Sequence, residues 1–389
     1  MTAIYHLSFN KAPPLQVNGN DQFISIAPSI HNDLREDVYS PQDGEPLSIT
    51  VAWLIESHNG NKARQLEFIE EACKISWLDG SQAYKNVQVK VPPAKLIGKN
   101  QDLHLALYVK AGEQEKAWQF DLLSDKISQS NNTVFVPALS APIKIKGRNG
   151  GMADSRSRTL SRLFDIGLEE PIIMEEQIGF DLEGHLWDAA LHMARWLHFQ
   201  LNKGSRSFLS QMLHEKPSLQ VLELGAGTGF VSIALSALLS DSITQSDGEI
   251  ARRASILATD LMPAMEVLQQ NIDHNESSRK KVDLQAAVLD WEELKKDSKE
   301  DGYDLIFVAD CTYNPAYFDA LCHAIQSSLH PEGICLLAKK HRHIDEGSLW
   351  DSMKKNRLSY ELVHGCEATL AEDSSHAFTG WGLYKIQSM

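Results

Sequence analysis

Residues Val221 to Phe230 read VLELGAGTGF, and this stretch decides the fold of the chain. An apolar run leads into a G-x-G-x-G turn made by Gly225, Gly227 and Gly229. Glycine permits a tight turn and lets a ligand approach the backbone without a clash with a Cβ atom. The apolar stretch 231–239 has the length of a helix, whose N-terminus would face that ligand. The pattern predicts a strand, a glycine loop and a helix around a nucleoside pocket.

The spacing of the glycines separates two kinds of nucleotide site. A dinucleotide-binding turn reads G-x-G-x-x-G or A, whereas Phe230 stands here where a small residue would be needed. The turn therefore favours S-adenosylmethionine over NAD as the cofactor. A glycine-rich turn can also be a structural loop without a ligand, and the strand ends considered below bear on that alternative.

Composition and charge limit the classes to which the chain can belong. Its 389 residues suffice for two domains, and 43% hydrophobic with 23% charged residues is typical of soluble globular proteins. A net charge of −15 argues against a general binder of nucleic acid or anionic membranes, which needs a basic face. The sequence contains no run of 18 uncharged apolar residues and no signal-peptide pattern. We expect no membrane association and no general nucleic-acid binding.

The cysteines indicate the compartment. The five form no C-x-x-C pair and no zinc-ligand spacing with histidine. Cys311, Cys322 and Cys335 fall in segments with the pattern of helices or strands rather than loops. A reduced compartment suits them, so we expect a protein of the cytoplasm or also the nucleus, without a metal. We also expect a monomer.

Residues 1–145 have the pattern of a β-rich domain. Short alternating runs recur at 47–55, 73–78, 87–91, 103–109, 118–123 and 133–136. Turn-forming clusters such as 57–61 and 128–132 separate them, and a strand period of two is clear. We predict a small antiparallel sandwich or barrel. It shows no catalytic pattern, which favours an accessory or docking role.

The segment 146–161 predicts the domain boundary. It reads KGRNGGMADSRSRTLS, is rich in Gly, Ser and Arg, and lacks apolar periodicity. That composition is typical of a flexible linker. Its three arginines could contact an acidic partner, but a solvated linker is the favoured interpretation.

From residue 162 to 389 the pattern changes to alternating strands and helices, which indicates a doubly wound α/β fold with a mostly parallel sheet. The helices are predicted at 185–201, 231–239, 262–274 and 317–329. Seven strands are predicted, at 221–224, 255–258, 283–289, 303–309, 333–338, 360–363 and 381–386. In such sheets ligands bind at the carboxyl ends of the strands, so the residues there are the candidates for function.

Acidic residues mark these strand ends. Glu223 precedes the glycine loop, and Asp260 closes the second strand about 30 residues further on. Asp260 is our candidate for accepting hydrogen bonds from the ribose hydroxyls; an N-cap of the next helix is the alternative, compatible reading. Asp290 and Trp291 end the third strand, where the base of a nucleoside would lie, although a tryptophan there can be simple core.

The fourth strand runs directly into Asp310. A charged residue immediately after a buried strand requires a reason, and facing a sulfonium or an incoming amine is one. The basic cluster Lys339 to His343 follows the fifth strand. A run of charges is usually a solvated face, with a substrate-docking patch as the alternative.

Together these motifs resemble the seven-β-strand protein-lysine methyltransferases, in particular the methyltransferase-like group that acts on chaperones and translation elongation factors. The resemblance covers about residues 165–389 and rests on four motifs: the segment GHLWDAA (184–190), the glycine loop, the aspartates after the second and third strands, and the sequence DCTY (310–313). It implies a protein substrate and contacts to S-adenosylmethionine from seven residues. These are Trp187, Gly225, Ala226, Gly227, Asp260, Trp291 and Ala309.

The resemblance also implies that Asp310 and Tyr313 line the opening for the target lysine. Methyl transfer is an in-line displacement, so alignment and exclusion of water matter more than acid-base groups. We therefore expect Asp310 to orient the amine through a hydrogen bond. Tyr313 would form a wall of the channel and offer a cation-π contact.

Three rival functions remain at this level. A nucleic-acid amino-methyltransferase would carry a D/N-P-P-Y/F motif after the fourth strand, and DCTY lacks both prolines. A small-molecule N-methyltransferase would have the same cofactor-binding part. A scaffold that binds the cofactor without catalysis is the third. Cofactor binding combined with a labelled-methyl assay distinguishes them.

Overall fold

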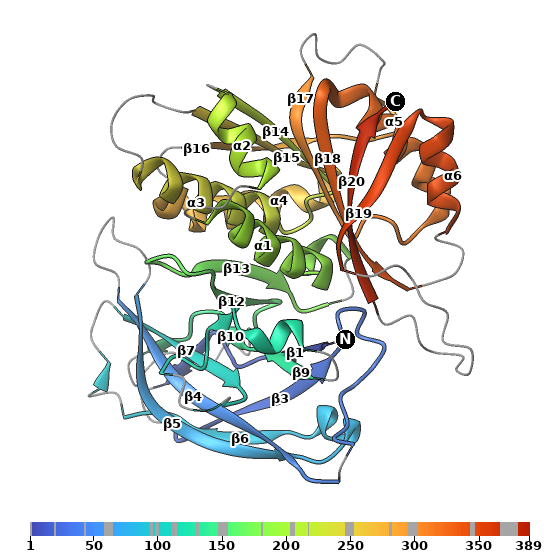
Figure 1. Ribbon diagram of the computed structural model, residues 1–389. Coiled ribbons are helices and arrows are strands. Elements are labelled where there is room, and N and C mark those ends of the chain that lie inside the picture. The colour runs from blue at the N-terminus through green and yellow to red at the C-terminus, as the bar shows by residue number, and fades with distance from the viewer. Residues whose placement is uncertain are drawn as a thin grey trace. The chain divides into compact units, whose positions relative to one another are not determined.

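The computed structural model describes most of the chain, and all structural statements here concern these residues. They are 2–18, 21–42, 44–57, 65–93, 96–97, 101–110, 112, 115–129, 132–146, 155–179, 182–202, 207–216, 218–245, 253–279, 282–294, 302–342, 347–365 and 380–389. They form two compact units, Thr2–His185 and Leu186–Met389. The first unit is rich in strands, and the second alternates strands and helices (Figure 1).

The β-rich unit contains two main sheets. The smaller has the order β6-β3-β1-β9, and the larger β13-β12-β10-β7-β4-β5 with β8 beside β12. A further pair joins β11 to β2. The strands are β1 (Ala3–Lys11), β2 (Gln16–Asn18), β3 (Phe23–His31), β4 (Leu47–Ser57), β5 (Gln65–Trp77), β6 (Val87–Lys90), β7 (Gln101–Tyr108), β8 (Phe120–Asp121), β9 (Thr133–Val136), β10 (Ala138–Ser140), β11 (Lys144–Lys146), β12 (Thr159–Asp165) and β13 (Ile172–Gln177). Most pairs are antiparallel as expected, but β1 and β9 are parallel.

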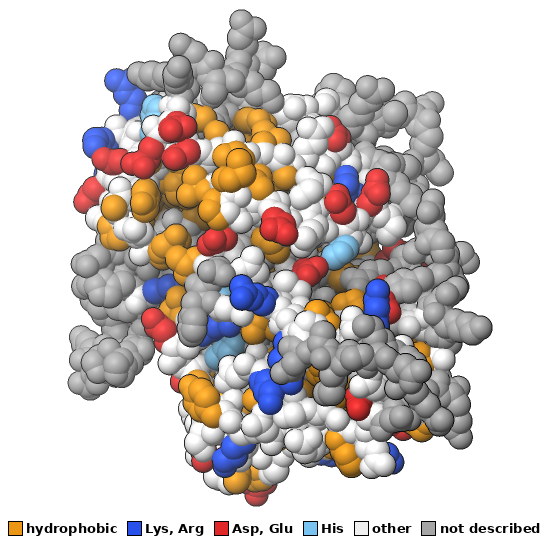
Figure 2. All heavy atoms as spheres, turned by 180° about the vertical axis from the view of Figure 1, so that it is seen from behind, with side chains coloured by type: hydrophobic (Ala, Val, Ile, Leu, Met, Phe, Trp, Pro, Cys, Tyr) orange, Lys and Arg blue, Asp and Glu red, His pale blue; other side chains and the backbone are white. Residues whose placement is uncertain are grey.

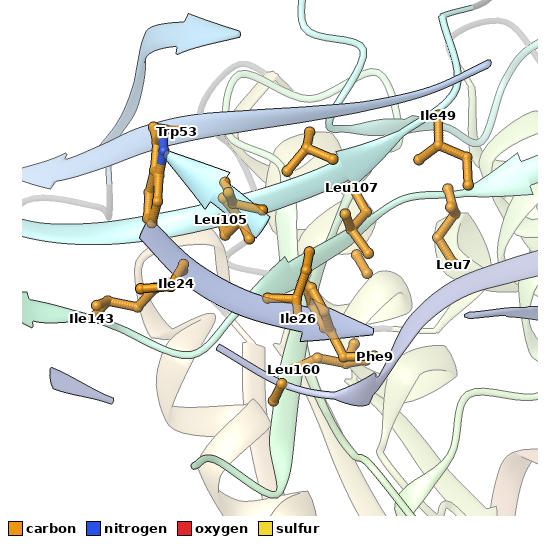
Figure 3. Close-up of a cluster of buried hydrophobic side chains, with 14 of the residues drawn as sticks. Leu7, Phe9, Ile24, Ile26, Ile49, Trp53, Leu105, Leu107, Ile143 and Leu160 are labelled. Atoms are coloured by element: carbon orange, nitrogen blue, oxygen red, sulfur yellow. The ribbon is translucent and has the colours of Figure 1, made fainter. Parts of the chain in front are cut away.

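One hydrophobic core lies between the two sheets, as in a sandwich. Side chains two positions apart on each strand enter it, which is the period that a strand imposes. Figure 3 shows Phe9 and Ile26 from the smaller sheet beside Leu105 and Leu107 from the larger. The indole of Trp53 is fully buried here and donates to the carbonyl of Lys90 over 2.7 Å. The alternation that predicted strands therefore also selects the buried face.

The domain boundary expected at 146–161 is incorrect. Strands β12 and β13 pair with each other and, through β10, extend the larger sheet of the β-rich unit, which ends at His185. Residues 147–154 of the expected linker lie outside the described residues. The sequence concealed β12 because Arg162 interrupts its apolar pattern. Arg162 is buried, and its charge is paired with Glu176 of β13 over 2.7 Å.

The second unit is built on a seven-stranded sheet of the predicted kind. Its order is β16-β15-β14-β17-β18-β20-β19, with the first five strands parallel and β20 antiparallel to both neighbours. The strands are β14 (Ser218–Leu224), β15 (Arg253–Asp260), β16 (Val282–Val288), β17 (Tyr303–Ala309), β18 (Leu329–His341), β19 (Leu358–Gly365) and β20 (Gly380–Ser388). The chain order reverses between β14 and β17, so their carboxyl ends form the switch point at which such sheets bind ligands.

Six α-helices are described in this unit. They are α1 (Asp188–Leu201), α2 (Phe208–Glu215), α3 (Phe230–Gln245), α4 (Met265–His274), α5 (Phe318–Ser328) and α6 (Ser348–Lys355). The sequence missed α2 and α6, which have only eight residues each. Helices α5 and α6 pack on the sheet in one core cluster that includes Phe318, Leu349 and Met353. Helix α3 is buried on all sides from Phe230 to Ser240, so it has no polar face to reveal an amphipathic pattern.

Candidate functional site

The glycine loop between β14 and α3 has the backbone that its sequence requires. Gly225, Gly227 and Gly229 have φ values of 69°, 52° and 82°, in the left-handed region that favours glycine. Ala226 N–H donates to the carbonyl of Thr259 over 2.9 Å, which fastens the loop to the neighbouring strand. A Cβ atom at Gly229 would lie 2.4 Å from Leu268, so the loop also packs tightly against α4.

The position of Asp260 links the second strand to this loop. Its Oδ2 accepts the N–H of Gly227 over 2.7 Å, and its Oδ1 accepts the N–H of Leu261 over 2.7 Å. Helix α4 begins only at Met265, so the carboxylate does not cap it. Asp260 instead holds the glycine loop at the end of the second strand.

Glu223 is in the interior. Its side chain is 1% exposed, and its Oε2 accepts the backbone N–H of Ser232 over 3.1 Å together with the Ser232 hydroxyl. Burial raises the pKa of Glu223 to about 7, against the lowering effect of these hydrogen bonds. Ser232 lies in the first turn of α3, where backbone N–H groups have no partner within the helix. Glu223 therefore fixes the helix start behind the glycine loop.

Trp291 lies against the glycine loop. A Cβ atom at Gly225 would lie 3.2 Å from Cζ2 of Trp291 and 2.4 Å from Sγ of Cys311. The indole also packs against the core cluster that contains α5, as the core interpretation expects, and its contact with a cofactor base stays a prediction. Asp290 accepts the N–H of Glu292 over 2.9 Å and thereby caps the turn that presents the indole.

Cys311 is a site residue that the sequence analysis missed. Its thiol lies 3.4–3.5 Å from the carbonyl oxygens of Leu224, Gly225 and Ala309. Burial raises its pKa well above the ordinary value, so the thiol stays protonated and donates. It joins the end of β17, including Ala309, to the glycine loop. Its place directly after Asp310 was the available signal.

Asp310 occupies an unusual backbone position at the end of β17. Its φ is 58°, which is uncommon for a residue with a side chain, although Asp is among those that tolerate it. The side chain is only 4% exposed. Oδ1 accepts the N–H of Lys340 over 3.3 Å, and Oδ2 accepts the guanidinium of Arg342. Tyr313 lies three residues further on and is 57% exposed.

The described residues of the basic cluster, Lys339 to Arg342, lie at the end of β18 and do not form a solvated face. Lys339 and His341 are buried within β18 itself. Lys340 pairs with the buried Asp188 over 2.7 Å, and Arg342 pairs with Asp310. Alternate residues at the end of β18 thus form internal ion pairs at the carboxyl edge of the sheet. His343 lies outside the described residues.

Trp187 joins this arrangement from the segment before α1. The Cζ atom of Arg342 lies 5.6 Å from the centre of the Trp187 ring, within cation-π range. The structure therefore gathers two groups of predicted residues: Gly225 with Trp291, and Trp187 with Asp310 through Arg342. Ala226, Gly227 and Gly229 lie between the ends of β14 and β15.

This geometry fits S-adenosylmethionine. The class of S-adenosylmethionine-dependent methyltransferases is defined by three features of this site. They are the strand, glycine loop and helix, the carboxylate at the end of the second strand, and the indole at the end of the third. A side chain at Gly225 would fill the space between the loop, Trp291 and Cys311. No group of three potential metal ligands occurs among the described residues.

Comparison with known proteins points to the same chemistry. Residues 168–356 match the family described as lysine methyltransferase. The chain is 28% identical over 179 residues to the protein N-lysine methyltransferase METTL21A of Danio rerio, a match covering 46% of this chain and 70% of the relative. It is 30% identical over 157 residues to the EEF1A lysine methyltransferase 3 of Xenopus tropicalis, a match that covers 40% of this chain and 57% of the relative.

A further relative bears on the β-rich unit. A UPF0665 family protein of Schizosaccharomyces pombe is 23% identical over 282 residues, which covers 70% of this chain and 78% of the relative. This match is longer than the unit Leu186–Met389, so it extends into the β-rich unit. The β-rich unit is therefore shared in part with another protein.

Proposed function

We propose that this methyltransferase transfers the methyl group of S-adenosylmethionine to the Nζ atom of a lysine in a protein substrate. The observation that carries the proposal is the position of Asp310. Its carboxylate lies at the end of β17, beside the thiol that touches the glycine loop. The family match over 168–356 supports the same chemistry.

The roles of the residues follow from the geometry. When bound, S-adenosylmethionine supplies an electrophilic methyl group on a positively charged sulfur. We assign the cofactor to the glycine loop and Asp260, with Trp291 beside its base. Asp310 orients the incoming amine through a hydrogen bond, and the exposed ring of Tyr313 walls the opening. None of these residues is assigned as a strong base, because aligning the reactants supplies most of the rate.

The substrate class is narrower than proteins in general. One relative is named as a methyltransferase of EEF1A, so a translation factor is our first candidate and a chaperone the second. We assign the selection of that protein to the β-rich unit, which raises the local concentration of the target near the site. The free cysteines of the described chain, Cys73, Cys311, Cys322 and Cys335, support a reduced compartment, the cytoplasm or nucleus, and we propose a monomer.

Other partners have less support. No helix among the described residues is long and apolar enough to cross a membrane. On the face drawn in Figure 2, acidic, basic and hydrophobic side chains are interspersed, which differs from the continuous basic face of a nucleic-acid binder.

Labelling tests the proposal. The full chain, incubated with S-adenosylmethionine carrying a tritiated methyl group, is added to a cell lysate and separately to purified EEF1A. We expect label in a protein band, located on lysine by mass spectrometry. Label only in small molecules would indicate a metabolite methyltransferase, and label in nucleic acid an amino-methyltransferase of bases. Cofactor binding without any label would indicate a scaffold.

A further inference from the structure

The Asp310 carboxylate poses an electrostatic problem for the function proposed above. A lysine with a pKa of about 10.4 is neutral in only roughly one molecule in two thousand at pH 7, and only the neutral amine attacks a methyl group. A carboxylate in contact with the amine favours its charged form, which cannot react. The residue that orients the nucleophile thus also works against its deprotonation.

Other carboxylates add to the negative potential at this edge of the sheet. The thiol of Cys311 lies within electrostatic range of three of them, which are Asp260, Asp310 and Glu223. Together with burial they hold the thiol in its neutral form. Glu223 is partly protonated near neutral pH because its pKa is about 7. The negative charge nearest the opening therefore belongs to Asp310.

Arg342 is placed to cancel that charge. Its guanidinium bonds Oδ2 of Asp310, and the two side chains are only 13% and 4% exposed. At this depth water screens the pair less than it would a surface pair, so the cation offsets most of the carboxylate charge. The ring of Trp187, 5.6 Å from Cζ, holds the guanidinium from the other side.

Two neighbouring groups add little free charge beside the pair. Lys340, two residues before Arg342, is paired with the buried Asp188 over 2.7 Å. His192 on α1 is held neutral because burial lowers its pKa to about 4. Arg342 is thus the described cation whose pairing sets the charge at Asp310.

We propose that Arg342 is a positioning residue that neutralises Asp310, so that Asp310 can orient the target lysine without keeping its amine protonated. This inference rests on the proposed function, since it concerns the same site. One oxygen of Asp310 accepts the Lys340 N–H and the other accepts the Arg342 guanidinium, so the carboxylate is fixed at the carboxyl edge of the sheet. Arginine suits the task because its guanidinium stays charged at all relevant pH values.

The cofactor pair itself measures the local charge without any protein substrate. S-adenosylmethionine carries a positive sulfonium, whereas its product S-adenosylhomocysteine is neutral at that sulfur. The ratio of their dissociation constants therefore reports the potential at the reacting methyl group. For charges on the order of 10 Å apart at an effective dielectric constant of about 20 to 40, losing one unit charge changes the affinity for a cation by roughly four- to fifteen-fold.

Calorimetric titration of the full chain with both ligands at pH 8 provides the test. Arg342→Gln should shift the ratio at least threefold in favour of S-adenosylmethionine, and Arg342→Lys should restore most of the original ratio. Asp310→Asn should shift it the opposite way, because the charge of Arg342 is then no longer offset by Asp310. The double variant Asp310→Asn/Arg342→Gln should lie close to the original ratio.

Lys355→Gln is the matched control. It removes the same charge from an ion pair with Asp319 whose side chains are 70% and 52% exposed, and it should leave the ratio unchanged. Equal ratios in all folded variants, or shifts of the same sign in Arg342→Gln and Asp310→Asn, would overturn the inference. If Arg342→Gln does not fold, Asp310→Asn and the double variant decide alone. A wild-type chain that binds neither ligand would instead refute the proposed function.

Discussion

Substituting Gly225 with alanine tests how the cofactor site is built. The residue has a φ of 69°, and the left-handed conformation costs a residue with a side chain about 1–2 kcal/mol. The new Cβ would lie 2.4 Å from Sγ of Cys311, far inside van der Waals contact. Overpacking of this kind costs about 1–3 kcal/mol. Gly225→Ala should therefore lower the free energy of unfolding of the second unit by about 2–5 kcal/mol.

Urea denaturation of single and double variants separates the two costs. Cys311→Ala removes Sγ and leaves its Cβ at 3.7 Å, an ordinary contact. The double variant should thus be more stable than the sum of the single effects predicts, by about 1–3 kcal/mol. Gly112→Ala is the matched control, because Gly112 has a φ of 77° but no atom within 4 Å of the added Cβ. Gly112 lies in the β-rich unit, so this variant should show the cost of the strain alone in the unfolding of that unit.

The reasoning has a clear point of failure. Additive effects of Gly225→Ala and Cys311→Ala would mean that the thiol does not press on the loop. A Gly225→Ala chain as stable as Gly112→Ala, with unchanged affinity for S-adenosylmethionine, would mean that the space at Gly225 is not needed by fold or cofactor.

Three further predictions concern other parts of the structure. Asp260→Ala should weaken cofactor binding by about 2–4 kcal/mol in calorimetry. Asp310→Asn should instead lower turnover and change cofactor affinity by less than tenfold. The reverse pattern would mean that the roles of the two aspartates are exchanged. Burial alone would raise the pKa of Glu176, but the attraction of the Arg162 guanidinium opposes it, and the pKa is lowered to about 2. The ionised carboxylate therefore stabilises the fold fully above its ordinary pKa of 4.5, and this stabilisation is lost as the pH falls towards 2. Glu176→Gln removes the charge partner of the buried Arg162 and should lower the free energy of unfolding by about 3–5 kcal/mol at pH 7. It should also weaken the loss of stability between pH 4.5 and pH 2. An unchanged dependence of stability on pH in this range would contradict the pairing. A chain that begins at Leu186 should bind cofactor but methylate the native target far more slowly, and equal kinetics would reduce the β-rich unit to a stability element.

Much of the second unit could be predicted from the sequence because its signals are local. The glycine loop predicts left-handed backbone, and apolar runs of four to seven residues mark the strands. All seven strands of the sheet were located in this way. Helix α6 was missed since its eight residues bury only Leu349 and Met353.

The contacts that the sequence did not reveal join residues far apart in the chain. Arg162 was not recognised as a buried residue, because nothing local shows that Glu176 and three backbone carbonyls receive its guanidinium. In the same way the basic cluster gave no sign that Asp310 and Asp188, from other elements, pair with it. Charge pairing depends on topology, and topology is settled only when the strands are placed side by side.

The most direct test of the central claim is to identify the atom that receives the methyl group. The full chain and its Asp310→Asn variant are incubated with labelled S-adenosylmethionine and purified EEF1A or lysate protein, and the labelled peptides are sequenced by mass spectrometry. The account predicts methyl groups on lysine Nζ with the wild-type chain and strongly reduced transfer with Asp310→Asn, although both bind the cofactor. Label on any other kind of atom, or equal labelling by the two chains, would contradict it.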